Sequence, residues 1–447
     1  MAYIDDFLKK HRIEEVECLI PDMAGIARGK IIPAEKFISG KRAAGLRIPE
    51  SVFIQTVTGG YPDDDGVTND AQVDVYLVPD EKTIRTVPWY PDPTAQVICD
   101  AYFLDDTPVT FSARYVLKRV LELYAEQGWT PIIAPELEFY LVDKNTDPDY
   151  PLLPPIGRSG RRETSRQAFG LDAVNEFDPL FEEVYDFCDA MRVEVDTLTH
   201  EGGSAQMEMN FNHGDALELA DQALLFKRGV REAALRHNVY ATFMAKPMQG
   251  EPGSSMHIHQ SVIDSKTGRN LFATKTGKDT RLFMHHIAGL QRYLPAAMPL
   301  LAPNVNSYRR LIPDSDAPIN THWGTDNRTV GFRVPISPAA GRRVENRVAG
   351  ADANPYLAIA GSLACGYLGM MEKLKPTKAI EGSAYRLAHT LPRTLHHALD
   401  RLGASRPLKN VLGDDFVEVV RAVKDAELNA YQQVISSWER EHLLLNV

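Results

Sequence analysis

The chain has 447 residues, of which 44% are hydrophobic and 24% are charged, and its formal net charge is −11. This length exceeds what one hydrophobic core usually supports, so we expect two domains. The acidic balance argues against a nucleic-acid partner, because phosphate affinity comes mainly from clustered Lys and Arg. The sequence contains no apolar run approaching the roughly 20 residues of a membrane-spanning helix, and its N-terminus lacks the apolar stretch of a signal peptide. We therefore expect a cytoplasmic protein that does not act at a membrane.

The first 105 residues predict a small β-rich unit. Apolar residues alternate over residues 16–20, and the segment VDVYLVPD near residue 75 predicts a second strand. From Ser112, a good helix N-cap, the apolar spacing becomes helical. We therefore predict a domain at 1–105 and a second domain at 106–447.

The second domain predicts strands that alternate with amphipathic helices. Asp215 followed by Glu218 predicts a capping box that opens a helix reaching about Asn238. Residues 142–170 combine Pro, Gly and charge without a period, which indicates a long surface loop. The last helix is expected to begin near Asp414 and to bury a stripe formed by Val417, Val420, Leu428, Tyr431, Ile435 and Trp438.

Four strand-like segments carry ionisable or polar residues at every second position, and such side chains share one face of a strand. The residues that share a face are Glu136 and Glu138; Gln206, Glu208 and Asn210; His257, His259 and Ser261; and Arg343, Glu345 and Arg347. One such segment alone fits an antiparallel sheet with one solvated face. Four together, with Glu201 just upstream of the second, supply the carboxylate-rich, partly imidazole set that Mg²⁺ or Mn²⁺ prefers.

A second group of residues in this part of the chain is cationic. It comprises Arg310, Arg328, Arg333, Arg343 and Arg347. Arginine binds carboxylate and phosphate oxygens in pairs, and metals beside arginines are what phosphoryl transfer requires. The sequence contains neither a Walker-type phosphate loop nor a GxGxxG motif after a strand, so a P-loop or Rossmann enzyme is not expected.

Several longer motifs follow one another along the chain: APELEFY, HEGGSAQMEMNF, GSSMHIHQS, NSYRRLIP, NRTVGFRVP and RRVENRVAG. In order and spacing they resemble the signatures of class I glutamine synthetases, and the resemblance covers nearly the whole chain. It implies an α+β fold, with a small N-terminal β-grasp domain and a large α/β catalytic domain built on a curved antiparallel sheet. It also implies a homo-oligomer of one hexameric ring or two stacked rings, with active sites between subunits. In this family ATP phosphorylates the γ-carboxylate of glutamate, and a nitrogen nucleophile then displaces the phosphate.

The resemblance also implies roles for individual residues. One Mg²⁺ or Mn²⁺ ion would be held by Glu138, Glu201 and Glu208, and a second by Glu136, His257 and Glu345. The residues implied to contact ATP are His259, Ser261, Arg333 and Arg343. Glutamate would be bound by the backbone of Gly253 and by Arg310 and Arg347, while Arg328 would assist phosphoryl transfer.

Two departures from the family pattern concern the nucleophile. Thr56 stands where glutamine synthetases place an aspartate that binds and deprotonates ammonium, and a threonine supplies neither the charge nor the base. Asp316 replaces a glutamate, which leaves room for a carbon chain, and we expect it to receive the amine proton. These changes resemble the γ-glutamylpolyamine and γ-glutamylputrescine synthetases, so the sequence predicts a glutamate–amine ligase of amine catabolism.

The identity of the amine is open at this point. Acids at residues 63–65 would hold the distal ammonium of a polyamine, whereas Tyr61, His322 and Trp323 equally favour an aromatic or short alkyl amine. A glutamine synthetase that uses ammonia remains the main alternative, with one of the acids at 63–65 replacing the missing aspartate. A non-catalytic relative is the third alternative, and it would be expected to have lost metal ligands.

Overall fold

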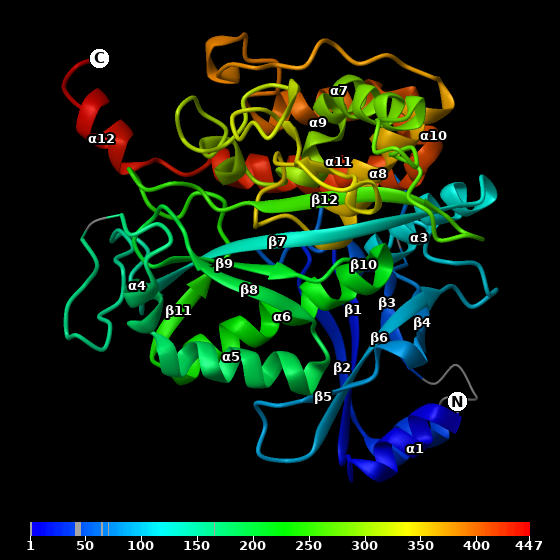
Figure 1. The fold of residues 1–447 in the computed structure, drawn as a ribbon. Helices are drawn as coiled ribbons and strands as arrows, with labels where there is room; N and C mark the ends of the chain where they lie inside the picture. The colour runs from blue at the N-terminus through cyan, green and yellow to red at the C-terminus, as the bar shows by residue number, and fades with distance from the viewer. Residues whose placement is uncertain (1, 41–45, 64–65, 70, 165) are drawn as a thin grey trace.

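The computed structural model describes residues 2–40, 46–63, 66–69, 71–164 and 166–447, which form two β-sheets with most of the helices around the second. In Figure 1 the first sheet, in blue, lies below the second, whose long strand β7 (Trp129–Asp143) crosses the molecule. Among the described helices, none combines the length and apolar character that a membrane crossing requires.

The first sheet has the strand order β2-β1-β6-β4-β3, with β5 paired to β6. Its elements are β1 (Glu15–Pro21), β2 (Ala27–Pro33), β3 (Arg47–Pro49), β4 (Asp74–Pro79), β5 (Arg85–Val87) and β6 (Thr94–Tyr102), with helices α1 (Ala2–Lys10) and α2 (Ala34–Gly40). Strands β1 and β6 are parallel, and the other pairs are antiparallel. The two strands predicted from this part of the sequence are confirmed as β1 and β4.

The second sheet has the strand order β13-β14-β15-β12-β7-β9-β8, and β10 and β11 also pair with β7. Its further strands are β8 (Val195–His200), β9 (Gln206–Phe211), β10 (Gly214–Asp215), β11 (Val239–Thr242), β12 (Met256–Asp264), β13 (Trp323–Thr325), β14 (Phe332–Val334) and β15 (Val344–Asn346). The pairs are antiparallel except for β13 with β14 at the edge, which are parallel.

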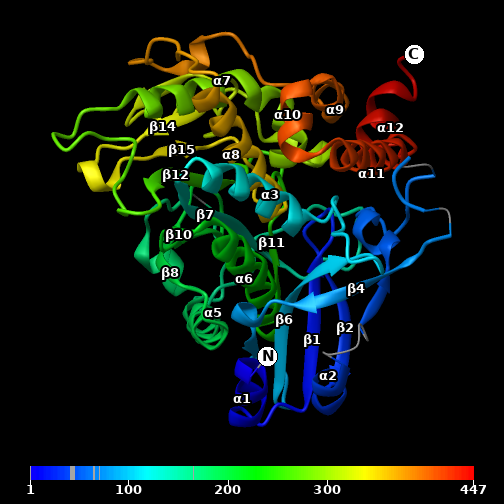
Figure 2. The same cartoon turned by 90° about the vertical axis from the view of Figure 1, so that its right-hand side faces the viewer.

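Helices α3, α6 and α8 pack around this sheet and against one another, and α7 packs on α8 (Figure 2). The helices of this part are α3 (Ala113–Glu126), α4 (Leu171–Asn175), α5 (Asp178–Met191), α6 (Ala216–Arg236), α7 (Arg281–Leu301), α8 (Pro355–Met371), α9 (Leu395–Ala404), α10 (Arg406–Leu412), α11 (Asp414–Gln432) and α12 (Ser437–Leu443). Ser112 is the N-cap residue of α3, as predicted. Asp215 caps α6 by accepting the N–H groups of Leu217 and Glu218 at 2.9 and 3.0 Å.

The predicted burial of the C-terminal stripe is wrong from Tyr431 onward. Val417 and Val420 are buried as expected, but Ile435 and Trp438 are 62% and 61% exposed, and Tyr431 is 44% exposed. The helix ends at Gln432, and α12, in red, projects from the body of the molecule (Figure 1). A hydrophobic period defines a helix face, but it does not specify which element covers that face.

One buried arginine ties the first sheet to the helices of the second. Arg114 of α3 is 1% exposed and contacts Asp80 and Asp100 at 2.7 and 2.8 Å, and Asp221 of α6 at 2.9 Å. The hydroxyl of Tyr356 also donates to Asp221 at 2.6 Å. Because a buried guanidinium needs such partners, this network fixes the two parts of the chain relative to each other.

Candidate active site

The strand register of the second sheet places the predicted metal ligands opposite one another. Glu138 of β7 is the direct partner of Glu208 of β9, and Glu136 is the partner of His257 of β12. On the other side of β12, His259 is the partner of Glu345 of β15. Directly opposite side chains on one face of a sheet lie within about 5.5 Å of each other, so pairing alone gathers carboxylates and imidazoles from four strands.

Two groups of these side chains have the geometry of a cation site. Glu136, His257 and Glu345 offer ligand atoms within 4.8 Å of one another, and so do Glu138, Glu208 and His257. The first group is the set predicted for one metal ion. The second contains two of the three ligands predicted for the other ion, with His257 in place of Glu201.

The charges of this cluster fit a divalent cation. Burial, together with the charges of Glu136 and Glu138, raises the pKa of Glu208 to about 10. Burial and then the charge of Glu138 raise the pKa of Glu201 to about 7, against the opposing charge of Arg328. A carboxylate whose ionisation is suppressed by neighbouring carboxylates reports an excess of negative charge, which a bound cation offsets.

The other half of the cluster is already ionised. Burial disfavours the charged form of Glu136, but hydrogen bonds with His257 at 3.2 Å and His259 at 2.7 Å outweigh it and hold its pKa well below the usual range. Burial likewise opposes ionisation of Glu345, but Arg347 and then His257 lower its pKa to about 2. These two carboxylates are therefore ready to act as ligands at any physiological pH.

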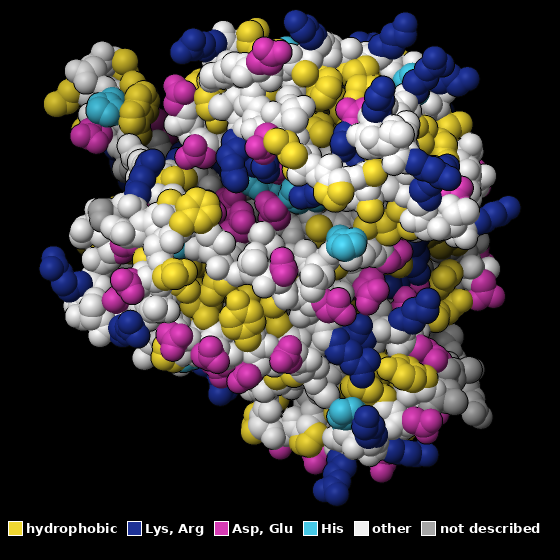
Figure 3. All heavy atoms as spheres, viewed as in Figure 1, with side chains coloured by type: hydrophobic (Ala, Val, Ile, Leu, Met, Phe, Trp, Pro, Cys, Tyr) yellow, Lys and Arg dark blue, Asp and Glu magenta, His cyan; other side chains and the backbone are white. Residues whose placement is uncertain are grey.

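The predicted ligands line one cavity of about 440 Å³. Figure 3 shows the hollow on this side of the molecule, where acidic, histidine and basic side chains gather side by side. The predicted residues that line it are Glu136, Glu138, Glu201, Glu208, His257, Glu345, Gly253, Arg310, Asp316, Arg328, Arg333 and Arg347. Residues from five strands, and from loops and strand ends around them, thus converge here, and we call this the central cavity.

A second cavity, of about 650 Å³, adjoins the central cavity and shares Glu136 and Asn210 with it. Three of the four residues predicted to contact ATP line it: His259, Ser261 and Arg343. The Nε atom of Arg343 lies 3.1 Å from Nδ1 of His259. The fourth, Arg333, instead lines the central cavity, where it pairs with Glu345 at 2.8 Å and with Asp326 at 2.5 Å.

The arginines predicted to bind glutamate are buried in the central cavity. Arg310 is 2% exposed, donates to the carbonyl of Val348, and has an Nε atom without a hydrogen-bond partner among the described residues. Burial lowers its pKa to about 10, so it remains a cation at neutral pH. Arg347 pairs with Glu345, and its Nε atom also lacks a described partner. Buried guanidinium groups with unused donors are suited to receive a carboxylate.

Gly253 is required by the close approach of Arg310. A Cβ atom at this position would lie 2.6 Å from the carbonyl oxygen of Ala245 and 2.8 Å from Cδ of Arg310. The Gly253 carbonyl accepts a hydrogen bond from Gln206 at 3.1 Å. The glycine therefore lets the backbone lie directly against the guanidinium side chain.

A third cavity, of about 640 Å³, adjoins the central cavity and shares Pro252 and Asp316 with it. Asp316 is exposed and has a backbone φ of +58°, which is unusual for a residue with a side chain. Its carboxylate is therefore available at the junction between the two cavities.

The residues of the N-terminal part that are predicted to recognise the nucleophile do not line the central cavity of the same chain, as far as the structure describes them. Thr56 is buried, and its hydroxyl donates to the Gly60 carbonyl at 3.1 Å and lies 2.9 Å from the hydroxyl of Thr58. Asp63 is exposed, while Asp64 and Asp65 lie outside the described residues. The role of Thr56 stays a prediction that depends on a neighbouring copy of the chain.

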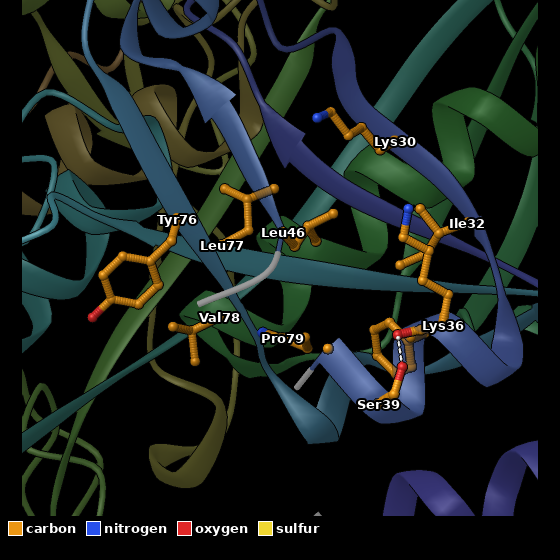
Figure 4. A pocket seen from close by; sticks show the side chains of 11 residues that line it. Lys30, Ile32, Lys36, Ser39, Leu46, Tyr76, Leu77, Val78 and Pro79 are labelled. Carbon is orange, nitrogen blue, oxygen red and sulfur yellow. Dashed lines mark hydrogen bonds between the residues drawn. The ribbon is translucent and has the colours of Figure 1, made fainter. Parts of the chain in front are cut away.

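The first sheet has a cavity of its own, of about 330 Å³, between β2, α2 and β4 (Figure 4). It is lined mainly by hydrocarbon, including Ile32, Leu46 and Val78, and the described residues around it include no carboxylate and no histidine. It therefore offers no ligand for a divalent cation.

Ser255 and Phe169 are among the residues of the central cavity that sequence reasoning missed. Ser255 donates through its backbone N–H to Glu138 at 2.9 Å, and its hydroxyl lies 2.5 Å from Glu138 and 2.9 Å from Nε2 of His257. It stands two positions before His257 on the same strand face, so the alternation already used for β12 could have found it. Phe169 lies in a loop without a period, where the sequence gives no such signal.

Comparison with known proteins identifies the family of the chain. The family model described as "Glutamine synthetase, catalytic domain" matches residues 110–443. The chain is 34% identical over 437 residues to γ-glutamylputrescine synthetase of Escherichia coli (strain K12), covering 96% of this chain and 92% of the relative. It is 32% identical over 448 residues to glutamate–isopropylamine ligase of Pseudomonas sp, covering 98% and 96%. A solved structure of apo GmaS superimposes with a TM-score of 0.84 at 26% identity and covers all of both chains. The chain belongs to the glutamine synthetase family.

Proposed function

We propose that this protein is an ATP-dependent ligase that joins the γ-carboxylate of glutamate to the nitrogen of an organic amine. The observation that carries the proposal is the series of three adjoining cavities. The central cavity, with its carboxylates and buried arginines, shares Glu136 with the predicted ATP cavity and Asp316 with the third cavity. A phosphate donor, an acid and a nucleophile can therefore meet at one place.

The residues support a two-step reaction. Glutamate bound against Arg310 and Arg347 would receive the terminal phosphoryl group of ATP on its γ-carboxylate, which releases ADP, and Arg328 would stabilise the charge that develops on the transferred group. The amine nitrogen would then form the C–N bond as the C–O bond to phosphate breaks. Asp316 would take the proton that the nitrogen loses.

Two Mg²⁺ or Mn²⁺ ions would be held by Glu138, Glu201 and Glu208 and by Glu136, His257 and Glu345. When bound, they would supply neutralisation of the phosphate oxygens and of the carboxylate cluster itself. The shared position of His257 between the two groups of ligand atoms supports sites that adjoin one another.

The preference for an amine over ammonia is supported by the names of two relatives and by the lining of the central cavity. The two relatives are named for joining glutamate to putrescine and to isopropylamine. The central cavity, of about 440 Å³, has Asp316 and the exposed ring of Phe169 in its lining, so it offers a carbon chain a contact that ammonia would not use.

We further propose that the first sheet is a β-grasp domain, that the domain boundary lies between residues 105 and 106, and that the protein works in the cytoplasm as a hexamer or dodecamer. The loop that contains Thr56 would then lie beside the active site of a neighbouring subunit. The uncharged hydroxyl of Thr56 supports the use of an amine that needs no carboxylate at that position.

The proposal is tested by measuring phosphate release from ATP with glutamate and Mg²⁺, with ammonium, putrescine, spermidine, isopropylamine or ethanolamine as the nitrogen donor. Each product is identified by mass. We expect γ-glutamyl amides and little glutamine. Efficient turnover of ammonium with none of the amines would instead identify a glutamine synthetase that uses ammonia.

A further inference from the structure

Phe169 has an unusual combination of exposure and backbone conformation. Its side chain is 71% exposed, and its φ is +62°, in the left-handed region that bulky residues rarely adopt. Such a conformation is strained and persists only where the surroundings impose it. It therefore indicates that the position of this ring matters to the protein.

The surroundings impose the conformation through the strand that carries a predicted metal ligand. The Phe169 N–H donates to the His200 carbonyl at 2.8 Å, at the end of β8. The His200 ring contacts the Glu201 carbonyl at 2.8 Å through Nδ1, and Glu163 at 3.0 Å through Nε2. Glu163 also accepts the Ala205 N–H at 2.7 Å. The loop before α4 is thus fastened to the strand ends beside Glu201.

The fastened ring lines the central cavity. Among the described residues that line this cavity, Phe169 is the aromatic one, and it stands among carboxylates and arginines. The same lining contains Asp316, the predicted proton acceptor, and Thr199 and Glu201 from the strand to which the loop is fastened. The described lining of this charged cavity offers the exposed ring no other phenyl ring to pack against, so we expect a substrate group to contact it.

We propose that Phe169 is the residue that selects the organic amine, by receiving the carbon chain of a primary alkyl amine on its ring face while the nitrogen lies toward Asp316. This inference rests on the proposed function and specifies its substrate class. Burial of a methylene against an apolar surface is worth about fourfold in affinity, and a distal ammonium over the ring face would add a cation–π contact. Ammonia, which has no carbon, would gain nothing from the ring.

The test measures KM and kcat for ammonium, methylamine, propylamine, butylamine and putrescine in the wild type and in Phe169→Ala, Phe169→Tyr and Tyr150→Ala. In Phe169→Ala we expect KM to rise about tenfold for butylamine and putrescine and less than twofold for ammonium, with KM for glutamate and ATP unchanged. Phe169→Tyr retains the ring and should stay close to the wild type.

Tyr150→Ala is the matched control, because Tyr150 is a 70% exposed aromatic residue in the same long loop that does not line the cavity. It should leave all five KM values unchanged. If the wild type uses amines but Phe169→Ala raises every KM equally or none of them, the assignment of Phe169 is wrong while the proposed function stands. If the wild type uses ammonium alone, both fail.

Discussion

Replacement of Arg310 by methionine should remove glutamate binding without destabilising the protein. Arg310 is fully enclosed, and the fall of its pKa from 12.5 to about 10 corresponds to about 3 kcal/mol against the charged form in the folded state. At neutral pH the residue is charged in both the folded and the unfolded chain, so this penalty opposes folding. Methionine removes the penalty and loses one hydrogen bond to the Val348 carbonyl, which is worth about 1 kcal/mol.

The two effects predict a thermal midpoint for Arg310→Met that is equal to or higher than that of the wild type. Glutamate affinity should fall by at least about 100-fold, since paired charge-assisted hydrogen bonds to a carboxylate are worth about 1.5–3 kcal/mol each. The assay is thermal unfolding of the protein with and without glutamate, together with KM for glutamate at saturating ATP and amine. The wild type should be stabilised by glutamate, and the variant should not.

Arg119→Met provides the matched control. Arg119 of α3 donates to the carbonyls of Val411 and Asn410 at 2.9 and 3.2 Å and lies outside the lining of the central cavity. This variant should lose about 1 kcal/mol of stability and keep its KM for glutamate. A variant of Arg310 that is strongly destabilised yet keeps a wild-type KM would show that the arginine is structural, and would refute the reasoning.

Three other predictions concern the charges and the close packing described above. Without metal, Glu208 holds a proton below about pH 10 and Glu201 below about pH 7, so cation binding releases protons. The Kd for Mn²⁺, measured by calorimetry, should therefore fall about tenfold per pH unit from pH 7 to 9. A pH-independent Kd would contradict this. Gly253→Ala should raise KM for glutamate at least tenfold in steady-state assays and leave KM for ATP unchanged, because the added Cβ atom collides with the Arg310 side chain. Equal changes in both KM values would contradict this prediction. Arg114→Met should lower the free energy of unfolding by about 3–5 kcal/mol in denaturant titrations, because it leaves the buried Asp221 without a cationic partner and removes the arginine partner of Asp80 and Asp100. An unchanged midpoint would exclude that role.

The composition of the site followed from the sequence, because it depends on alternation along single strands. Glu136 and Glu138 share a face whatever their neighbours are, and the same holds for His257 and His259. The pairing of Glu138 with Glu208 did not follow, since register is set by turns and by packing between distant segments. The placement of Arg333 beside Glu345, away from the predicted ATP contacts, likewise depends on how β14 pairs with β15.

The errors and omissions lie where no period constrains the chain. Trp438 has the helical spacing of a core residue, but Ser436 opens a separate helix with its own capping box, and the stripe leaves the body of the protein. Phe169 is positioned by a hydrogen bond from its backbone to His200, a residue 31 positions later in the chain. Backbone contacts of this kind carry almost no side-chain signature in a sequence.

The same distinction separates the residues expected to carry out phosphoryl transfer from those expected to select the nucleophile. The predicted metal ligands lie on or beside paired strands of one sheet, where a changed residue would alter several neighbours at once. By contrast, Phe169 and Asp316 both lie in loops, and both have a positive φ, at +62° and +58°. A loop can be reshaped while the sheet keeps its register, so the nitrogen donor can change while phosphoryl transfer to glutamate is retained. If this division holds, Phe169 substitutions will alter the order of preference among amines but leave metal affinity and KM for ATP unchanged.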